Sequence, residues 1–306
     1  MAIGVGGRAL GMGGAYTALA SDVTAGYWNP AGLSHIIYPQ VTLMHNELFG
    51  SLANYDYGAV ALPVGVSTSL AFSVIRLGID GIPDTRNALI DVNGNGIFDG
   101  NDRLDYNKIT SFNAASWAFY FSYAKKQSDD FSYGGNVKII YEDLGAGTAT
   151  GIGFDVSAQY HVTEKFVLGA NFQDVTTTFL AWSTGTKEFI TPTLKLGTAY
   201  FIDAFDGRFA PAVDVDLRFE GRSSAANAHV GPVSFDFHSG LEFDYKHLVA
   251  LRTGYSDIGE MNFGAGIHLP KFDIDYSFAR DTDIDNTHRI SLTFIFQAEQ
   301  FARSTE

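Results

Sequence analysis

Beyond residue 36 the chain alternates between hydrophobic and polar positions with the two-residue period of β-strands. In residues 287–296, Ile290, Leu292 and Phe294 fall on one face, whereas Arg289 and Ser291 fall on the other. Side chains along a strand point alternately to the two faces of a sheet, so each segment has one apolar face and one polar face. The pattern predicts about fourteen strands of roughly ten residues, at residues 38–50, 53–62, 66–79, 112–124, 131–143, 150–161, 165–174, 190–201, 208–220, 232–244, 247–257, 261–269, 271–280 and 287–296.

The connections between these segments alternate in length. Every second connection is short, and those between them are mostly longer, led by residues 80–111, 176–189 and 221–231. Short turns at one end and long loops at the other are typical of outer-membrane barrels. The connection over residues 50–52 is an exception, because it is short where a long loop is expected.

Alternation alone also fits a soluble sandwich, in which two sheets cover each other's apolar faces. A sheet this large, with an aromatic-rich face and no helices after residue 36 to cover it, has only lipid against which to bury that face. The chain holds 25 Phe, 15 Tyr and 33 Gly in 306 residues. We therefore expect an all-β fold: a closed antiparallel transmembrane β-barrel of about 14 strands.

The first 35 residues lack this alternation. Asp22 is expected to cap a short helix over residues 23–27, which must end near Asn29 because a residue before proline avoids helical geometry. Glycines suit tight turns and close backbone packing, and three are clustered here: Gly11, Gly13 and Gly14. This segment should be compact and free of strands.

Two neighbouring motifs in this segment carry a resemblance to a known family. The run GGRALGMGGAYTALASD over residues 6–22 is followed by YWNPAGL over residues 27–33. Together they resemble the start of PorV/PorQ-type proteins, a branch of the FadL-like outer-membrane barrels. The resemblance implies a plug of residues 1–35 inside the lumen of a barrel of residues 36–298, with a C-terminal tail of residues 299–306. The plug residues in the motifs are Arg8, Gly11, Gly13, Gly14, Asp22, Asn29, Pro30 and Gly32.

The polar face of the later segments should line the lumen, and it carries many charges. Its functional interpretation is a cation-favouring passage or a docking surface for the plug, with Arg8 pairing with one of the carboxylates. The alternative is a hydrated wall of ordinary ion pairs, since a lumen needs polar residues whatever it carries. The expected lumen-wall residues are Asp214, Asp216, Arg218, Asp236, Glu242, Arg252, Asp273, Asp275 and Arg289.

The long loop at residues 80–111, expected to be extracellular, contains a calcium-loop pattern over residues 91–102. We expect a structural Ca²⁺ ion that stiffens the loop. Asp102 is shorter than the glutamate usual at the last position and no helices flank the loop, so the alternative is a solvated turn. The candidate ligands are Asp91, Asn93, Asn95, the carbonyl of Ile97, Asp99 and Asp102.

Composition excludes several other classes. A formal charge of −14 argues against nucleic acid, whose phosphates require a basic surface. No cysteine exists to act as a nucleophile and the eight histidines are scattered, so we expect no enzyme. No apolar run of about 18 residues offers a transmembrane helix. Trp28 should pack in the plug, and Trp117 and Trp182 in the interfacial girdle.

A bacterial outer-membrane location is expected, with lipid as a partner. The chain shows no signal peptide at Met1, so we interpret its start as a mature or re-engineered terminus whose precursor carried one.

Three functions stay open. The resemblance favours a non-catalytic component of protein export or surface attachment, which would bind cargo, secretion or surface proteins. The first alternative is a FadL-like passive channel for hydrophobic small molecules. Against it, residues 80–111 are largely polar, whereas such uptake calls for an apolar groove on the long loops. The second alternative is a scaffold barrel in a surface assembly.

Overall fold

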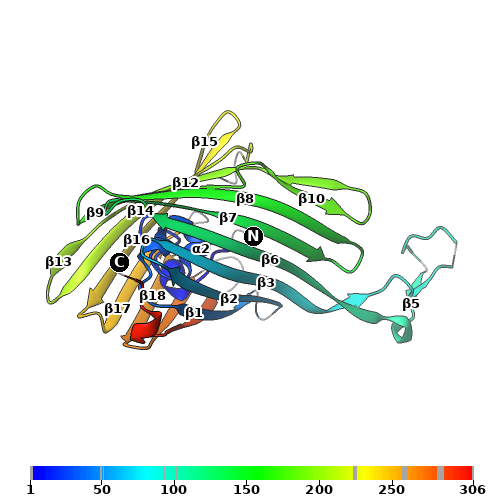
Figure 1. Ribbon diagram of the computed structural model, residues 1–306. Helices are drawn as coiled ribbons and strands as arrows, with labels where there is room; N and C mark the ends of the chain where they lie inside the picture. Colours follow the sequence, from blue (N-terminus) through cyan, green and yellow to red (C-terminus); the bar gives the residue numbers. More distant parts are fainter. Residues whose placement is uncertain are drawn as a thin grey trace.

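The computed structural model is a closed antiparallel β-barrel of 14 long strands (Figure 1). Each long strand pairs with its sequence neighbours, and β1 pairs with β20 to close the sheet, with Leu43 opposite Leu292. Closure leaves no unpaired edge, as a β-structure in a bilayer requires. The residues described are 3–48, 50, 52–92, 94–100, 102–222, 226–256, 261–280 and 286–304.

The predicted barrel fold is confirmed, and each expected segment corresponds to one long strand. The long strands are β1 (Gln40–Leu48), β2 (Ala53–Val64), β3 (Thr68–Asp84), β6 (Thr110–Lys126), β7 (Phe131–Asp143), β8 (Thr148–His161), β9 (Phe166–Gln173), β12 (Thr193–Tyr200), β14 (Gly207–Arg218), β16 (Val233–Tyr245), β17 (Val249–Tyr255), β18 (Met261–Leu269), β19 (Phe272–Arg280) and β20 (Thr287–Ile295).

Short strands extend these hairpins beyond the boundaries expected from sequence. β10 (Thr178–Trp182) and β11 (Lys187–Ile190) occupy an expected loop, as does β15 (Ala228–Val230), while β13 (Ile202–Ala204) lengthens a turn. β3 and β6 run past the wall and lead to an arm that carries β4 (Leu89–Ile90), β5 (Arg103–Leu104) and the 3-10 helix η2 (Tyr106–Lys108) (Figure 1). These short strands form by hydrogen bonding to neighbouring strands. They are too short to show a clear two-residue period in the sequence.

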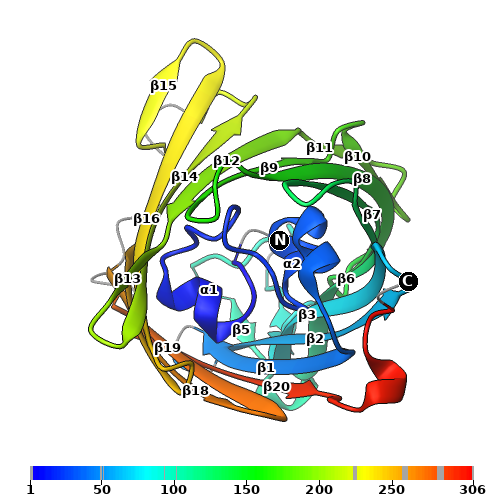
Figure 2. The ribbon, with the colours of Figure 1, turned by 60° about the vertical axis from the view of Figure 1, so that its left-hand side comes forward.

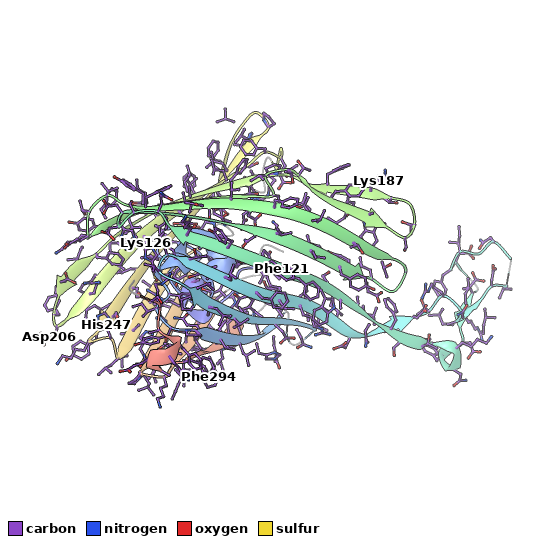
Figure 3. The ribbon with its side chains drawn as sticks, in the orientation of Figure 1. Phe121, Lys126, Lys187, Asp206, His247 and Phe294 are labelled. Carbon is purple, nitrogen blue, oxygen red and sulfur yellow. The ribbon has the colours of Figure 1, made fainter. Side chains whose placement is uncertain are left out.

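The outer face of the barrel is apolar between two polar ends. Phe121 is 50% exposed on the outside of the wall, as is Phe294 at 41%. Lys126, Asp206 and His247 lie at the end with short turns, and Lys187 lies at the opposite end (Figure 3). An apolar band between polar ends is what a bilayer-spanning barrel presents to lipid.

The N-terminal segment, residues 3–36, lies within the ring of strands (Figure 2). It contains α1 (Gly7–Gly11), α2 (Ala25–Trp28) and the 3-10 helix η1 (Pro30–His35), and a last 3-10 turn, η4 (Glu299–Phe301), follows β20. Among the described residues, no helix is long and apolar enough to cross a membrane. This segment supplies much of the buried hydrophobic core, which is therefore inside the barrel.

The expected helix of residues 23–27 is shorter and starts later. Asp22 does not cap it: its carboxylate accepts a hydrogen bond from the Thr24 amide at 2.8 Å, which makes a turn before α2. The helix ends as expected at Asn29, whose backbone is extended and whose side chain caps η1 by accepting from the Ala31 amide at 3.2 Å.

Candidate functional site: the N-terminal segment and the inner wall

Polar side chains of the wall bind the backbone of the N-terminal segment on one side of the barrel. The Asp214 carboxylate of β14 accepts from the amides of Tyr16 and Thr17 at 3.0 and 2.8 Å. On β8, Ser157 accepts from the Ala31 amide at 2.9 Å. Three wall amides donate to carbonyls of the segment: Asn136 to Gly26, Gln159 to Ala18 and Asn171 to Trp28. These bonds satisfy backbone groups that neither helix nor sheet pairs.

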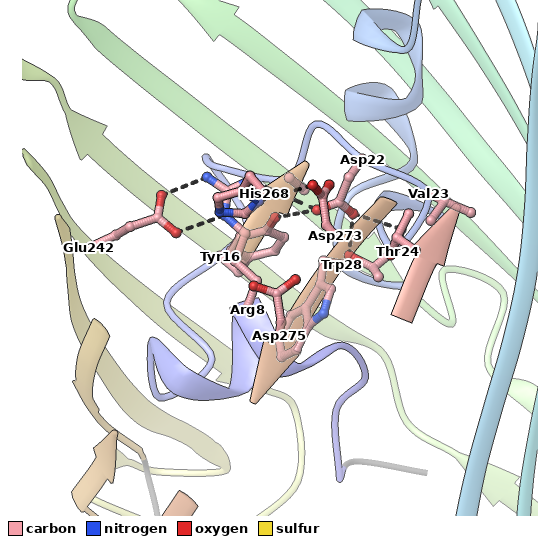
Figure 4. A network of polar contacts seen from close by, with 12 residues as sticks. Arg8, Tyr16, Asp22, Val23, Thr24, Trp28, Glu242, His268, Asp273 and Asp275 are labelled. Carbon is pink, nitrogen blue, oxygen red and sulfur yellow. Dashed lines mark hydrogen bonds and ion pairs between the residues drawn. The ribbon is translucent and has the colours of Figure 1, made fainter. Parts of the chain in front are cut away.

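A network of charged groups joins the segment to β16, β17 and β19 (Figure 4). The guanidinium of Arg8 donates twice to the Glu242 carboxylate, at 2.9 and 2.7 Å. Arg252 also donates to Glu242 and to Asp275, each at 2.6 Å. Asp22 lies 3.9 Å from Arg8 and accepts from the Tyr16 hydroxyl at 2.6 Å. Each buried charge thus has a partner of opposite sign, which offsets the cost of taking it out of water.

Several groups of the segment have shifted pKa values, and two of them, Arg8 and His35, decide its charge at pH 7. Burial would lower the pKa of Arg8, but the Glu242 carboxylate together with Tyr16 and Asp22 outweighs burial and raises this pKa well above the ordinary value. Burial, helped by the ring of His161, lowers the pKa of His35 to about 4. Arg8 is therefore charged and His35 neutral at pH 7, where the His35 Nε2 lies 2.8 Å from the Gln159 side-chain oxygen.

Glycines lie where the backbone of the segment approaches the backbone of the wall most closely, and we call this set of glycines the glycine seat. A Cβ added to Gly254 of β17 would lie 2.2 Å from the backbone carbon of Met12, and one on Gly240 of β16 would lie 2.5 Å from its carbonyl oxygen. Facing them, a Cβ on Gly13 of the segment would lie 2.6 Å from the Tyr255 nitrogen. Gly169 of β9 shows the same closeness to Thr17. Only glycine lets the two backbones meet at these distances.

Gly32 in the NPAG motif has the same role within the segment itself. A Cβ there would lie 1.9 Å from the carbonyl oxygen of Ala20. The motif glycine is thus needed to fold the segment back on itself before the first strand.

The opposite side of the inner wall, formed by β1, β2, β3 and β6, is mainly apolar. Its contact with the segment includes an edge-to-face pair of Tyr27 and Tyr120 with centroids 6.1 Å apart, and a hydrogen bond from the Gly6 amide to the Met44 sulfur. The larger buried inward-facing apolar side chains of this wall are Met44, Leu48, Tyr55, Tyr57, Ile75 and Tyr120, and smaller polar side chains, Thr42, Asn46, Ser69, Ser73 and Ser122, lie among them. The lumen therefore has a polar half that binds the segment and an apolar half that packs against it.

The expected lumen-wall residues all face inward, but not as an open acidic surface. Asp214, Asp216, Asp236, Glu242, Arg252, Asp275 and Arg289 are buried, and Arg218 and Asp273 are half-buried. The charges are balanced by cations that the sequence analysis did not assign to the lumen: Lys195 pairs with Asp216, and Arg222 joins Arg218 on Asp236. In this region the N-terminal segment covers the wall and these cations offset its carboxylates, and the cation-favouring passage stays a prediction.

The three tryptophans differ in how their positions compare with those expected from the sequence. Trp28 is buried in the segment, where its indole donates to the Val5 carbonyl at 2.8 Å. Trp117 faces outward on β6. Trp182 does not belong to a girdle: it packs inward against Leu180 and the nearby Ile140 and Ala149. The short strand β10, which was expected to be loop, turns it into the lumen.

Residues 91–102 form the loop closed by the β4–β5 pair. The Asp91 carboxylate accepts from the Gly96 amide at 2.7 Å, and Asp102 accepts from the amides of Val92 and Asp99 at 2.8 and 3.0 Å. Asn95 donates to Asp99 at 2.7 Å. Among the described residues, no group of three or more acidic or histidine side chains converges as metal ligands. Asn93 lies outside the described residues, and the calcium site stays a prediction.

No protein-family model and no curated protein matches the chain. Several solved structures share its fold along nearly the whole length. The "CymD monoaromatic hydrocarbon channel" aligns with a TM-score of 0.65 at 14% identity, covering 99% of each chain. A Pseudomonas aeruginosa FadL homologue aligns with a TM-score of 0.62 at 13% identity, covering 97% of this chain and 99% of that one.

The toluene transporter TbuX of Ralstonia pickettii aligns with a TM-score of 0.60 at 14% identity, covering 96% of this chain and 99% of that chain. The protein thus has the fold of the FadL-like outer-membrane barrels. Its assignment to the PorV/PorQ branch stays a prediction that rests on the N-terminal motifs.

The glycine seat leads to a direct test. We expect Gly254→Ala to displace the N-terminal segment, because the new methyl group would overlap the Met12 backbone, at a cost of about 1–3 kcal/mol. Limited proteolysis of residues 3–36 in the folded barrel should become at least several-fold faster.

Gly58→Ala is the matched control, since a Cβ at this outward-facing position meets only Leu43, at 3.5 Å. Equal proteolysis in both variants would show that backbone contact with β17 does not hold the segment.

Proposed function

We propose that the protein is a passive outer-membrane channel for hydrophobic small molecules. The observation that carries this proposal is the division of the lumen, in which one half binds the N-terminal segment through hydrogen bonds and the other half presents apolar side chains. A hydrophobic solute can replace side-chain packing contacts on this wall at little cost. The N-terminal segment acts in this proposal as the plug.

The proposed route runs between the plug and the inward faces of β1, β2, β3 and β6. Toward the extracellular end, the half-buried Leu77 and a second apolar cluster that includes Leu180 and Trp182 extend the lining. On the arm, Ile97 and Phe98 are 67% and 63% exposed, so the loops offer more apolar surface than the polar composition of residues 80–111 indicates. Two of the structural neighbours are a toluene transporter and a monoaromatic hydrocarbon channel, and both support the same solute class.

The role in protein export or surface attachment stays a prediction from the N-terminal motifs alone. No contact of the described residues favours a particular protein partner. The hydrophobic channel is therefore the function that we propose.

Uptake of toluene by cells with an intact lipopolysaccharide leaflet tests this function. Cells that contain the wild-type protein should take up labelled toluene several-fold faster than cells without it. Leu77→Asp should reduce this gain about tenfold, because it places a charge on the apolar route, where desolvating it is costly.

Thr287→Asp is the control, since it adds the same carboxylate to an inward position on β20 of the polar half. Heat-modifiable migration verifies that each variant is folded. Uptake that does not depend on the protein would overturn the function, and equal effects of the two variants would overturn the route.

We propose as a second property that residues 91–102 bind Ca²⁺. Gly94 and Gly96 both have φ near 75°, which allows the sharp bend of such a loop, and the β4–β5 pair brings its ends together. Side-chain oxygens of Asp91, Asn95, Asp99 and Asp102, with the carbonyl of Ile97, would hold a hard cation after the loop amides release the carboxylates.

Calcium removal should therefore expose the arm to proteases. In the wild-type protein, chelation should speed cleavage within residues 80–111 at least several-fold, and the double change Asp91→Ala and Asp99→Ala should make cleavage fast with or without Ca²⁺. Asp84→Ala serves as control, since Asp84 pairs with Arg86 outside the loop. If chelation does not change the rate at which the wild-type arm is cleaved, residues 91–102 do not bind Ca²⁺.

A further inference from the structure

Two adjacent polar side chains of the mainly apolar inner wall are buried without a partner in the protein. Asn46 on β1 is 0% exposed, and neither its side-chain nitrogen nor its side-chain oxygen forms a hydrogen bond with any residue that the structure describes. The same holds for the hydroxyl group of Tyr55 on β2, which is also 0% exposed. Buried polar groups are hydrogen-bonded in nearly all folded proteins, so these two exceptions on one wall indicate a role.

Strand pairing places the two groups side by side. Asn46 lies directly opposite Tyr55 across the pairing of β1 with β2, and directly opposite Arg289 across the pairing of β1 with β20. Directly opposite residues of an antiparallel pair have their Cβ atoms about 5 Å apart. A single small polar group can therefore reach both the Asn46 amide and the Tyr55 hydroxyl.

The pair lies on the route that we propose for hydrophobic solutes. Tyr55 is directly opposite Leu77 of β3, which lines this route. Asn46 is the next inward position after Met44, whose sulfur accepts from the Gly6 amide, and it lies on the loop side of that contact. A solute that moves from the loops along the apolar wall thus meets Asn46 and Tyr55 before it reaches Gly6.

The hydrogen-bonding capacity of the pair fits one kind of polar group. The Asn46 amide both donates and accepts, as does the Tyr55 hydroxyl. A hydroxyl group on the solute has the same two capacities, so it can accept from the Asn46 nitrogen while it donates to the Asn46 oxygen or to Tyr55. A carboxylate only accepts and leaves the Asn46 oxygen without a donor, and a hydrocarbon leaves both side chains unpaired.

We propose that Asn46 and Tyr55 form a binding site for the hydroxyl group of a phenol, whose aromatic ring packs against the apolar wall beside Leu77. The inference rests on the proposed function, because the phenol reaches the site by the route of the hydrophobic solutes. It narrows the solute class to aromatic compounds that carry one uncharged hydroxyl group.

Two compounds that differ by one hydroxyl group test this site. 4-Fluorophenol, which is uncharged at pH 7, and fluorobenzene are each titrated into the purified protein in lipid nanodiscs. Binding is measured from the fluorine NMR line width, and the signal of nanodiscs without protein is subtracted. We expect 4-fluorophenol to bind about tenfold more tightly than fluorobenzene, because it alone supplies the missing hydrogen bonds.

Variants assign this preference to the two side chains. Asn46→Leu should reduce the ratio to about one by weakening 4-fluorophenol alone, because leucine has a similar shape and no hydrogen-bonding group. Tyr55→Phe, which removes only the hydroxyl, should reduce the ratio about threefold. Asn54→Leu is the matched control, since it makes the same change on the outward face of β2 and should leave the ratio unchanged. Heat-modifiable migration verifies that each variant is folded.

The possible results separate this inference from the proposed function. Equal binding of the two compounds to the wild-type protein, as expected if the pair binds only water, overturns the hydroxyl site and leaves the channel in place. The same conclusion follows if Asn46→Leu and Tyr55→Phe leave the ratio unchanged. Tighter binding of 4-fluorobenzoate than of 4-fluorophenol would assign the site to anions through Arg289 and also overturn it. If neither fluorobenzene nor 4-fluorophenol binds, the proposed function fails as well.

Discussion

Closure of the sheet through the pairing of β1 with β20 is the constraint on which the rest of the structure depends. A closed barrel pairs the backbone hydrogen-bonding groups of every strand, as lipid requires. It also creates an inward face that must be filled or hydrated. Here residues 3–36 fill it. Most features of the wall, from its inward glycines to its buried ion pairs, follow from having to accept a folded segment of the same chain.

The wall accepts this segment in two physically different ways. On the β14–β19 side, glycines such as Gly254 bring the backbones together, and Glu242 shares two arginines, Arg8 of the segment and Arg252 of the wall. Separating these groups would leave buried charges without a partner, so breaking this contact costs much free energy. The side with Tyr55 and Ile75 is held by packing alone over much of its area, and such contacts are readily exchanged for those of a hydrophobic solute. The proposed channel uses this difference.

The strands could be predicted because most long strands keep one apolar face toward lipid, and that alternation is visible without any knowledge of the interior. The polar half of the lumen was equally visible, since Asp214 and Asp216 alternate with valines. Its neutralisation was not, because Lys195 meets Asp216 only across the pairing of two strands, and Arg222, which follows β14, meets Asp236 of β16.

The apolar half was missed for a different reason. At Tyr55 and Tyr57 the alternation is reversed, because the polar neighbour Asp56 faces outward and the tyrosines face the lumen. At Ile75 the outward neighbour Val74 is also hydrophobic, so the two faces are hard to tell apart. The seat had a signal that was overlooked: Gly240 and Gly254 fall on the same face as the buried charges Glu242 and Arg252. Glycine at an inward position of a barrel strand indicates that another backbone approaches it closely.

The most direct measurement of the central claim is the position of a bound hydrophobic solute inside the barrel. Crystals of the protein soaked with iodobenzene would show it through the anomalous scattering of iodine. The account predicts an iodine peak between the N-terminal segment and the inward faces of β1, β2, β3 and β6, with the Arg8–Glu242 contact intact. A peak between the segment and the β14–β19 wall, or a displaced segment that leaves Glu242 without Arg8, would contradict it.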